Sequence, residues 1–484
     1  MLYFTRAFER RGGGNGREDI LACGFGARFA CRRRARNGGR FADPGAHLQG
    51  AAANGGACEL DRLLCRCRQW FAVFNADTSV QSAGGAPLTA TATQGGKGWL
   101  VTGFTGYDYQ IGDRIVAGVL GDFDFGSVTG GYLDPANGAT GTMKEKYQWA
   151  AGGRLGWLVF PEFLAYVSGG YTQAHFTGFS LNNGTTLPAN TYNGWFASIG
   201  VDTTFPLLGN GWFFRSDYRY AQYNTATFGE VNAAGAVVDL QTIRPAVQTV
   251  TAGLAYKFNS APTTPLGAGF SFADFLSAPR GPSHWTGFYL AGGGGYGTWA
   301  AYSTTQSPAG VPLASTTNGG RGWFGTVNGG YDYQLTDRLV AGAFADFDFA
   351  NIKGTFQDPN PAGPLAGSMS ERSSWAAGLR GGWLITPAIL SYYDVAFSQA
   401  NFSSANLGGV ATIGSNTYNG WFLGTGLETA LPFFGKGWFA RIEYRYATYK
   451  AANISEVFGT GAVRDIMNVN PVVQTIRTEL VYRF

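Results

Sequence analysis

The stretch PVVQTIRTELVYRF, residues 471–484, alternates between two kinds of side chain. One set is mostly apolar and ends in the aromatic Phe484, while the other contains Arg477 and Glu479. Because successive side chains of a β-strand point to opposite faces, the pattern predicts a strand with one apolar and one polar face. Residues 245–258, PAVQTVTAGLAYKF, have the same pattern. An apolar outer face, a polar inner face and a terminal aromatic are typical of a transmembrane β-strand.

Composition supports an all-β protein. The chain has 484 residues, of which 74 are glycine, 15% are aromatic and 14% are charged. Few charges with many glycines and aromatics favour numerous strands joined by turns. The sequence contains no apolar run long enough for a membrane helix. A membrane-spanning form of this chain would therefore have to be a β-barrel.

Residues 1–69 differ in composition from the rest of the chain. They contain 13 Arg, no Lys, only 6 Asp and Glu, and all five cysteines. A basic tail for nucleic acid or anionic lipid is one interpretation. A zinc site is another, although Cys65 and Cys67 lack the usual ligand spacing. We favour a third interpretation, a disordered or out-of-frame segment, because no apolar signal-peptide core is present. No nucleic-acid partner is expected.

A long internal repeat follows. The segment GGKGWLVTGFTGYDYQIGDRIVAGVLGDFDF at 95–125 returns as GGRGWFGTVNGGYDYQLTDRLVAGAFADFDF at 319–349, and NTYNGWF at 190–196 returns at 416–422. Such self-similarity is the signature of a repeated architecture. The predicted organisation is the atypical segment 1–69, a first copy 70–258 with a truncated first strand, a linker 259–283 rich in Pro, Gly and Ser, and a second copy 284–484.

Eight strand-like runs are predicted in the second copy. Tight turns such as 334–338 alternate with long polar segments such as 352–370, which is typical of outer-membrane barrels. The predicted fold class is an all-β, transmembrane, antiparallel up-and-down β-barrel built as two tandem eight-stranded repeats. The alternative is one merged 15–16-stranded barrel, because an unclosed strand edge in lipid is costly. The runs lie near 285–302, 321–334, 338–351, 371–385, 389–403, 417–431, 437–450 and 471–484.

The charged residues of these strands share one face. In the run 437–450, Arg441 and Arg445 lie opposite Trp438 and Tyr444. An Arg or Lys on the lipid face costs about 2–4 kcal/mol at mid-bilayer, so these charges are predicted to point inward. A barrel of eight strands has room inside only for side chains. The predicted interior charge network consists of Asp122, Asp124, Arg154, Arg215, Asp217, Arg219, Asp346, Asp348, Arg380, Arg441, Glu443, Arg445, Arg477 and Glu479.

Several motifs together resemble a known family. WTGFYLAGGGGYG at 285–297, GYDYQ at 330–334, EYRYA at 443–447 and the closing aromatic strand are similar to the small porin-like outer-membrane proteins of alphaproteobacteria, which are OmpA-like and opacity-type eight-stranded barrels. The resemblance implies the outer membrane of a Gram-negative bacterium, with lipid and lipopolysaccharide around the barrel. It also implies that Phe484 is the aromatic read by the barrel-assembly machinery; its alternative role is that of an ordinary aromatic-girdle residue.

No catalytic, cofactor-binding or metal site is predicted. The glycines at 292–297 lie within a strand and precede no helix that could hold a phosphate, and none of the three histidines recurs in the other copy. We therefore expect a non-enzymatic protein with a structural or narrow porin-like role in the cell envelope. One alternative is a wide diffusion porin for small solutes. Another is an adhesin or ligand-binding protein that acts through long loops such as 306–317. The oligomeric state is left open.

Overall fold

The computed structural model describes residues 67–160, 163–204, 211–258, 285–431 and 434–484. The predicted linker 259–283 and most of the predicted segment 1–69 lie outside the described residues. Among the described residues, no helix is long and apolar enough to cross a membrane.

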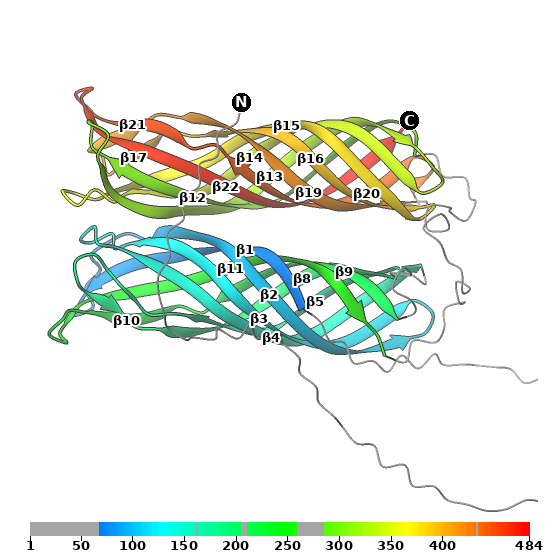
Figure 1. The fold of residues 1–484 in the computed structure, drawn as a ribbon, viewed down its shortest axis with the longest axis horizontal. Helices are drawn as coiled ribbons and strands as arrows, with labels where there is room; N and C mark the ends of the chain where they lie inside the picture. Colours follow the sequence, from blue (N-terminus) through cyan, green and yellow to red (C-terminus); the bar gives the residue numbers. More distant parts are fainter. Residues whose placement is uncertain (1–66, 161–162, 205–210, 259–284, 432–433) are drawn as a thin grey trace, which may run out of the picture. The chain divides into compact units, whose positions relative to one another are not determined.

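In the first copy, eight long antiparallel strands pair in a closed ring, the first ring, coloured blue to green in Figure 1. The order is β1, β2, β3, β4, β5, β8, β9 and β11, and β11 pairs back with β1. Three short strands, β6, β7 and β10, belong to the loops. The bounds are β1 Cys67–Ser82, β2 Ala92–Ile111, β3 Ile115–Leu133, β4 Thr140–Phe160, β5 Phe163–Phe176, β6 Phe179–Ser180, β7 Thr186–Leu187, β8 Asn190–Thr204, β9 Trp212–Tyr223, β10 Ala226–Val231 and β11 Val237–Tyr256.

The second copy follows the same plan, in yellow-green to red in Figure 1. Its ring, the second ring, runs β12, β13, β14, β15, β16, β19, β20 and β22, and β22 pairs back with β12. Strands β17, β18 and β21 lie in the loops. The bounds are β12 Gly287–Gln306, β13 Pro312–Gln334, β14 Leu339–Asp358, β15 Leu365–Thr386, β16 Ile389–Phe402, β17 Ala405–Leu407, β18 Ala411–Ile413, β19 Asn416–Ala430, β20 Trp438–Tyr449, β21 Ala452–Phe458 and β22 Val463–Arg483.

The predicted fold class needs correction. The described strands number 22, not 16, and all belong to one hydrogen-bonded sheet rather than to two separate sheets. Between the strands of the two copies, the backbone pairing is a single β-bridge, from Asn318 of β13 to Gln94 of β2. The extra strands arise because backbone pairing continues into the loops. In the residue registers of the described strands, β11 pairs with β1, β9 and β10, and β22 pairs with β12, β20 and β21.

The long strands also extend beyond the predicted runs. The segment 352–370 was expected to be a loop, yet β14 continues to Asp358 and β15 begins at Leu365. In the same way β22 begins at Val463 rather than near residue 471. Sequence alternation marks only the part of a strand with an apolar face against lipid. Beyond the lipid that contrast is lost, although the backbone still forms ladder hydrogen bonds.

The first strands of the two copies are described over different lengths. As described, β1 has 16 residues and β12 has 20. Cys67 pairs with Gly103 of β2, whereas Gly287 reaches Asp332 of β13. The described part of β1 therefore includes three residues of the segment 1–69 that was predicted to be atypical.

Side chains alternate between an exposed outer face and a buried inner face along the ring strands. On β3, for example, Phe123 and Phe125 are exposed whereas Asp122 and Asp124 are buried. Exposed aromatics of this kind suit an apolar lipid environment and its interfaces. The outer aromatics of the first ring strands include Trp99, Tyr107, Tyr109, Phe123, Phe125, Trp157, Tyr171 and Trp195.

Candidate functional site: the charged interior

Glu428 of β19 is the centre of one group of charges inside the second ring. Its carboxylate lies 3.2 Å from Arg380, 2.9 Å from Arg441 and 2.6 Å from Arg483. Arg483 also lies 2.7 Å from Asp332. These side chains come from five different strands, because each places its polar face inward at this level. The Glu428 cluster therefore ties one side of the ring to the other.

A second group of charges in this ring surrounds Glu443 of β20. Arg445 forms ion pairs with Glu443 and, at 2.8 Å, with Asp346. Arg477 lies 2.9 Å from Asp348 and 3.8 Å from Glu443. Because ions taken out of water must be compensated by opposite charges and hydrogen bonds, this Glu443 cluster is a salt-bridge network rather than a set of independent sites.

Asp202 of β8 occupies, in the first ring, the position that corresponds to Glu428 in the second. It lies 2.6 Å from Arg215, 3.3 Å from Arg154 and 3.7 Å from Lys257. Arg154 also donates a hydrogen bond to Asp108 at 2.6 Å. The five residues occupy the positions that correspond to the Glu428 cluster in the repeat. The two rings therefore share this arrangement with different side chains.

Arg219 of β9 is the main cation of the remaining interior of the first ring. Its guanidinium donates to Asp122 at 2.8 Å and lies 3.9 Å from Asp124. Gln148 donates to the same Asp124 oxygen, Oδ2, at 2.6 Å. A cavity of about 30 Å³ borders these groups, and its lining includes Thr251. Such a volume is enough for a water molecule between polar groups.

Small residues make room for the charged side chains. A Cβ placed on Gly342 of β14 would collide with the Asp332 carboxylate, and one on Gly118 of β3 would collide with Asp108. Aromatic rings fill the space around the guanidinium groups: Arg483 lies 4.5 Å from the Trp285 ring centre. The interior is thus occupied by packed side chains.

The structure buries thirteen of the fourteen predicted interior residues. Asp217 is partly buried, and its carboxylate accepts hydrogen bonds from Tyr166 at 3.2 Å and Ser198 at 3.0 Å. The buried thirteen are Asp122, Asp124, Arg154, Arg215, Arg219, Asp346, Asp348, Arg380, Arg441, Glu443, Arg445, Arg477 and Glu479.

Sequence reasoning missed the charges that complete the network. Glu428 and Asp202, the two central carboxylates, sit near the ends of strands whose other inward residues are uncharged. Period-two alternation already placed them on the inner face, so that signal was available. The missed interior residues include Asp108, Glu145, Asp202, Lys257, Asp332, Glu371, Asp394, Glu428 and Arg483.

Phe484 lies just past the end of β22. Its side chain is 73% exposed, its backbone N–H donates to the Phe288 carbonyl at 3.0 Å, and its ring meets Tyr482 edge-on. An exposed terminal aromatic remains accessible to another molecule.

Comparison with curated proteins finds the 31 kDa outer-membrane immunogenic proteins of Brucella melitensis biotype 1 and Brucella suis biovar 1. Each is 26% identical to this chain over 195 residues, which is 39% of the chain and 75% of the relative. The protein is an outer-membrane β-barrel protein of a Gram-negative bacterium. No family model matches the chain. The predicted OmpA-like and opacity-type classification stays a prediction.

Among solved structures, a FadL homologue of Pseudomonas aeruginosa is 14% identical and has a TM-score of 0.27, covering 88% of this chain and 90% of its own. The attachment invasion locus protein Ail of Yersinia pestis is 14% identical and has a TM-score of 0.22, covering 40% of this chain and 98% of its own. These scores are too low to support an argument, so the strand pairings alone define the fold of this outer-membrane protein.

Proposed function

We propose that this outer-membrane protein has a structural role in the envelope and that its interior is closed to solutes. The observation that supports the proposal is the salt-bridge network, in which Arg441 and Arg477 are almost completely buried. Both are bound to carboxylates on other strands. The predicted alternative of a wide diffusion porin would instead need a continuous water-filled lumen.

The energetics of buried ions favour a closed interior. Removing one partner of a buried ion pair typically costs about 3–5 kcal/mol, because the remaining charge is left uncompensated. A solute moving past the Glu428 cluster would have to separate several such pairs at once. The network therefore acts as a filling that holds the strands together and leaves room for little more than single water molecules.

The direct test is the single-channel conductance of the refolded full-length protein in a planar bilayer. We expect no steady openings of porin size. Heat-modifiable migration in electrophoresis should show in parallel that the protein is folded. Steady porin-size openings from folded protein would contradict the proposal.

A matched pair of variants tests the role of the salt bridges. Replacing both Glu428→Ala and Arg441→Ala removes a central pair, and we expect small, flickering conductance steps because the cavity admits water. Lys353→Ala changes an exposed cation on β14 and should stay silent like the unmodified protein. Equal conductance of the two variants would show that the Glu428 cluster does not close the interior.

Partners for the outer surface are proposed from the exposure of its side chains. We place lipid and lipopolysaccharide against the outer aromatic face, and the barrel-assembly machinery at Phe484, because both surfaces are exposed. Adhesion or ligand binding through the loops stays a prediction.

A further inference from the structure

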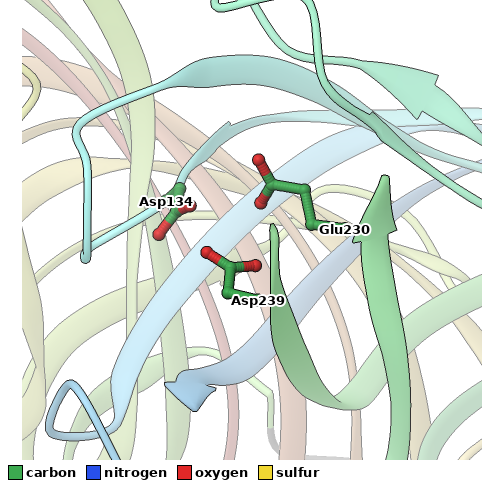
Figure 2. Close-up of side chains that lie close together, drawn as sticks. All are labelled: Asp134, Glu230 and Asp239. Atoms are coloured by element: carbon green, nitrogen blue, oxygen red, sulfur yellow. The ribbon is translucent and has the colours of Figure 1, made fainter. Parts of the chain in front are cut away.

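Three carboxylates meet at the loop end of the first copy. Asp134 directly follows β3, Glu230 lies on β10 and Asp239 lies on β11, and Figure 2 shows their carboxyl groups gathered around one point. One oxygen from each lies within 4.8 Å of the others. All three residues are buried. We call this group the Asp134 cluster.

The Asp134 cluster has little to neutralise it. The side chains that donate hydrogen bonds to it are neutral: Gln241 donates to Glu230 at 3.0 Å and to Asp239 at 3.2 Å, and Thr185 donates to Glu230. One oxygen of the fully buried Asp134 accepts no hydrogen bond. Among the described residues, no basic side chain forms a salt bridge with the cluster. Buried carboxylates without a cation are costly.

The second copy shows the same three carboxylates with a cation among them. Asp358, Glu456 and Asp465 occupy the corresponding positions and also lie within 4.8 Å of one another. The guanidinium of Arg464 is 2.5 Å from Asp358, 2.5 Å from Glu456 and 3.7 Å from Asp465. In the second copy, a positive group therefore compensates the three carboxylates.

The residue that corresponds to Arg464 in the first copy is Val238, which is exposed and carries no charge. Three neighbours that are polar in the first copy are apolar in the second, where Thr305 and Asn360 donate to Asp358 and Asp465 instead. Tyr132, Thr185 and Gln241 of the first copy correspond to Phe356, Ala411 and Met467 of the second.

We propose that the Asp134 cluster binds a divalent metal cation, with Ca²⁺ as the ion that fits best, and that Arg464 takes the place of this cation in the second copy. Ca²⁺ takes oxygen ligands at 2.3–2.6 Å. Two such ligands on opposite sides of the ion are at most about 5 Å apart, in keeping with the 4.8 Å limit of the cluster. Water supplies the remaining ligands.

The surroundings of the site orient its ligands. Gln241 holds both Glu230 and Asp239, and Tyr132 in turn donates to the Gln241 side-chain oxygen at 2.5 Å. Groups that orient ligating carboxylates in this way tune metal affinity. The backbone N–H of Ala136 fixes one oxygen of Asp134 at 2.8 Å, which leaves the other oxygen for the ion.

The site lies beyond the lipid. The outermost exposed aromatic on β3 is Phe125, and the chain continues in strand conformation to Leu133 before it reaches Asp134. At 3.2–3.4 Å per residue this is about 30 Å along the strand. The Asp134 cluster is thus set at the loop end of the first copy, outside the span marked by the exposed aromatics of β3.

The test is calorimetric titration of CaCl₂ into the refolded full-length protein in detergent, free of lipopolysaccharide. We expect saturable binding that weakens at least tenfold in Val238→Arg, which supplies the cation found in the second copy, and in Asp134→Asn. Undiminished binding in both variants, or no saturable binding in the unmodified protein, would overturn the proposal.

The second copy supplies the control. Asp358→Asn removes the corresponding carboxylate and should leave Ca²⁺ binding unchanged, because Arg464 already fills that cluster. Loss of binding in Asp358→Asn but not in Asp134→Asn would place the ion elsewhere and overturn the proposal. Asp239→Asn is an independent ligand variant should Val238→Arg not fold, as judged by heat-modifiable migration.

Discussion

The interiors of the two rings differ most on their closing strands. β22 of the second copy carries Arg477 and Glu479, whereas the corresponding residues of β11 are Thr251 and Gly253. Arg477 binds Asp348 in the second ring. Thr251 instead borders a cavity of about 30 Å³ in the first. The same ring architecture therefore accommodates an Arg–Asp ion pair in one copy and a neutral side chain beside a small cavity in the other.

The largest difference in stability is expected at the two central carboxylates. Glu428→Gln leaves Arg380, Arg441 and Arg483 short of a negative partner and should lower the free energy of unfolding by about 4–5 kcal/mol. Asp202→Asn in the first ring should cost less, because two of its three ion pairs are longer than 3 Å. Urea unfolding of the refolded variants in bilayers measures both. An equal or larger loss in Asp202→Asn would show that pair distance does not set the cost.

Making the second ring resemble the first is the next test. Arg477→Thr removes the partner of Asp348 and opens space, so we expect a loss of about 3 kcal/mol in the free energy of unfolding. The double variant Arg477→Thr and Asp348→Asn removes the uncompensated charge as well and should recover part of that loss. No recovery, in the same urea experiment, would mean that packing rather than charge makes Arg477 necessary.

A smaller change in stability is expected at the Asp134 cluster, and its sign should depend on whether Ca²⁺ is bound. Burial and the neighbouring carboxylates raise the pKa of Asp134 to about 7. The folded state then binds the proton more tightly than the unfolded chain, so the metal-free protein gains stability as the pH falls from 7 toward about 4. Asp134→Asn should therefore raise the thermal midpoint at pH 8 without Ca²⁺ and leave it nearly unchanged at pH 4.

Calcium should reverse the effect of Asp134→Asn on the thermal midpoint. With saturating Ca²⁺ at pH 8, the unmodified protein gains binding free energy that Asp134→Asn lacks, so the variant should have the lower thermal midpoint. Asp358→Asn in the second copy should show no such reversal. A reversal in Asp358→Asn as well would remove the distinction between the two clusters.

The smallest effect on stability is expected at the terminal aromatics. Phe484 and its counterpart Phe258 are both exposed, at 73% and 46%, so replacing either by Ala should change the free energy of unfolding by less than about 0.5 kcal/mol. Phe484→Ala should nevertheless reduce the amount of protein assembled in the outer membrane of cells, while Phe258→Ala should not. Equal assembly of both variants would make Phe484 an ordinary girdle residue.

The sequence predicted the ring strands well because lipid imposes a strict alternation on them. Arg441, Glu443 and Arg445 could be assigned to the interior from β20 alone, since a charge on the lipid face is costly. The pairing partner of each charge could not be predicted. Glu428 meets Arg380, Arg441 and Arg483 only after ring closure, which depends on the register of distant strands.

The alternation of apolar and polar residues did not predict the Asp134 cluster. Asp134, Glu230 and Asp239 lie on segments that appeared to be loops, where neither face of a strand meets lipid and alternation carries no information. Their meeting depends on β10 folding back against β11. The recurrence of all three residues in the second copy was a signal that sequence comparison could have used.

The closure of each ring by its first and last strands also sets the order of folding. Tyr289 near the start of β12 pairs with Arg483 near the end of β22, so this ladder forms only between the two ends of the copy. Contacts between distant segments are slow to form because a long loop must close first. Until β22 arrives, β12 keeps an open edge that could pair with another chain. Folding of the protein therefore requires that the open edge of β12 be kept from pairing with other chains until β22 has formed its ladder.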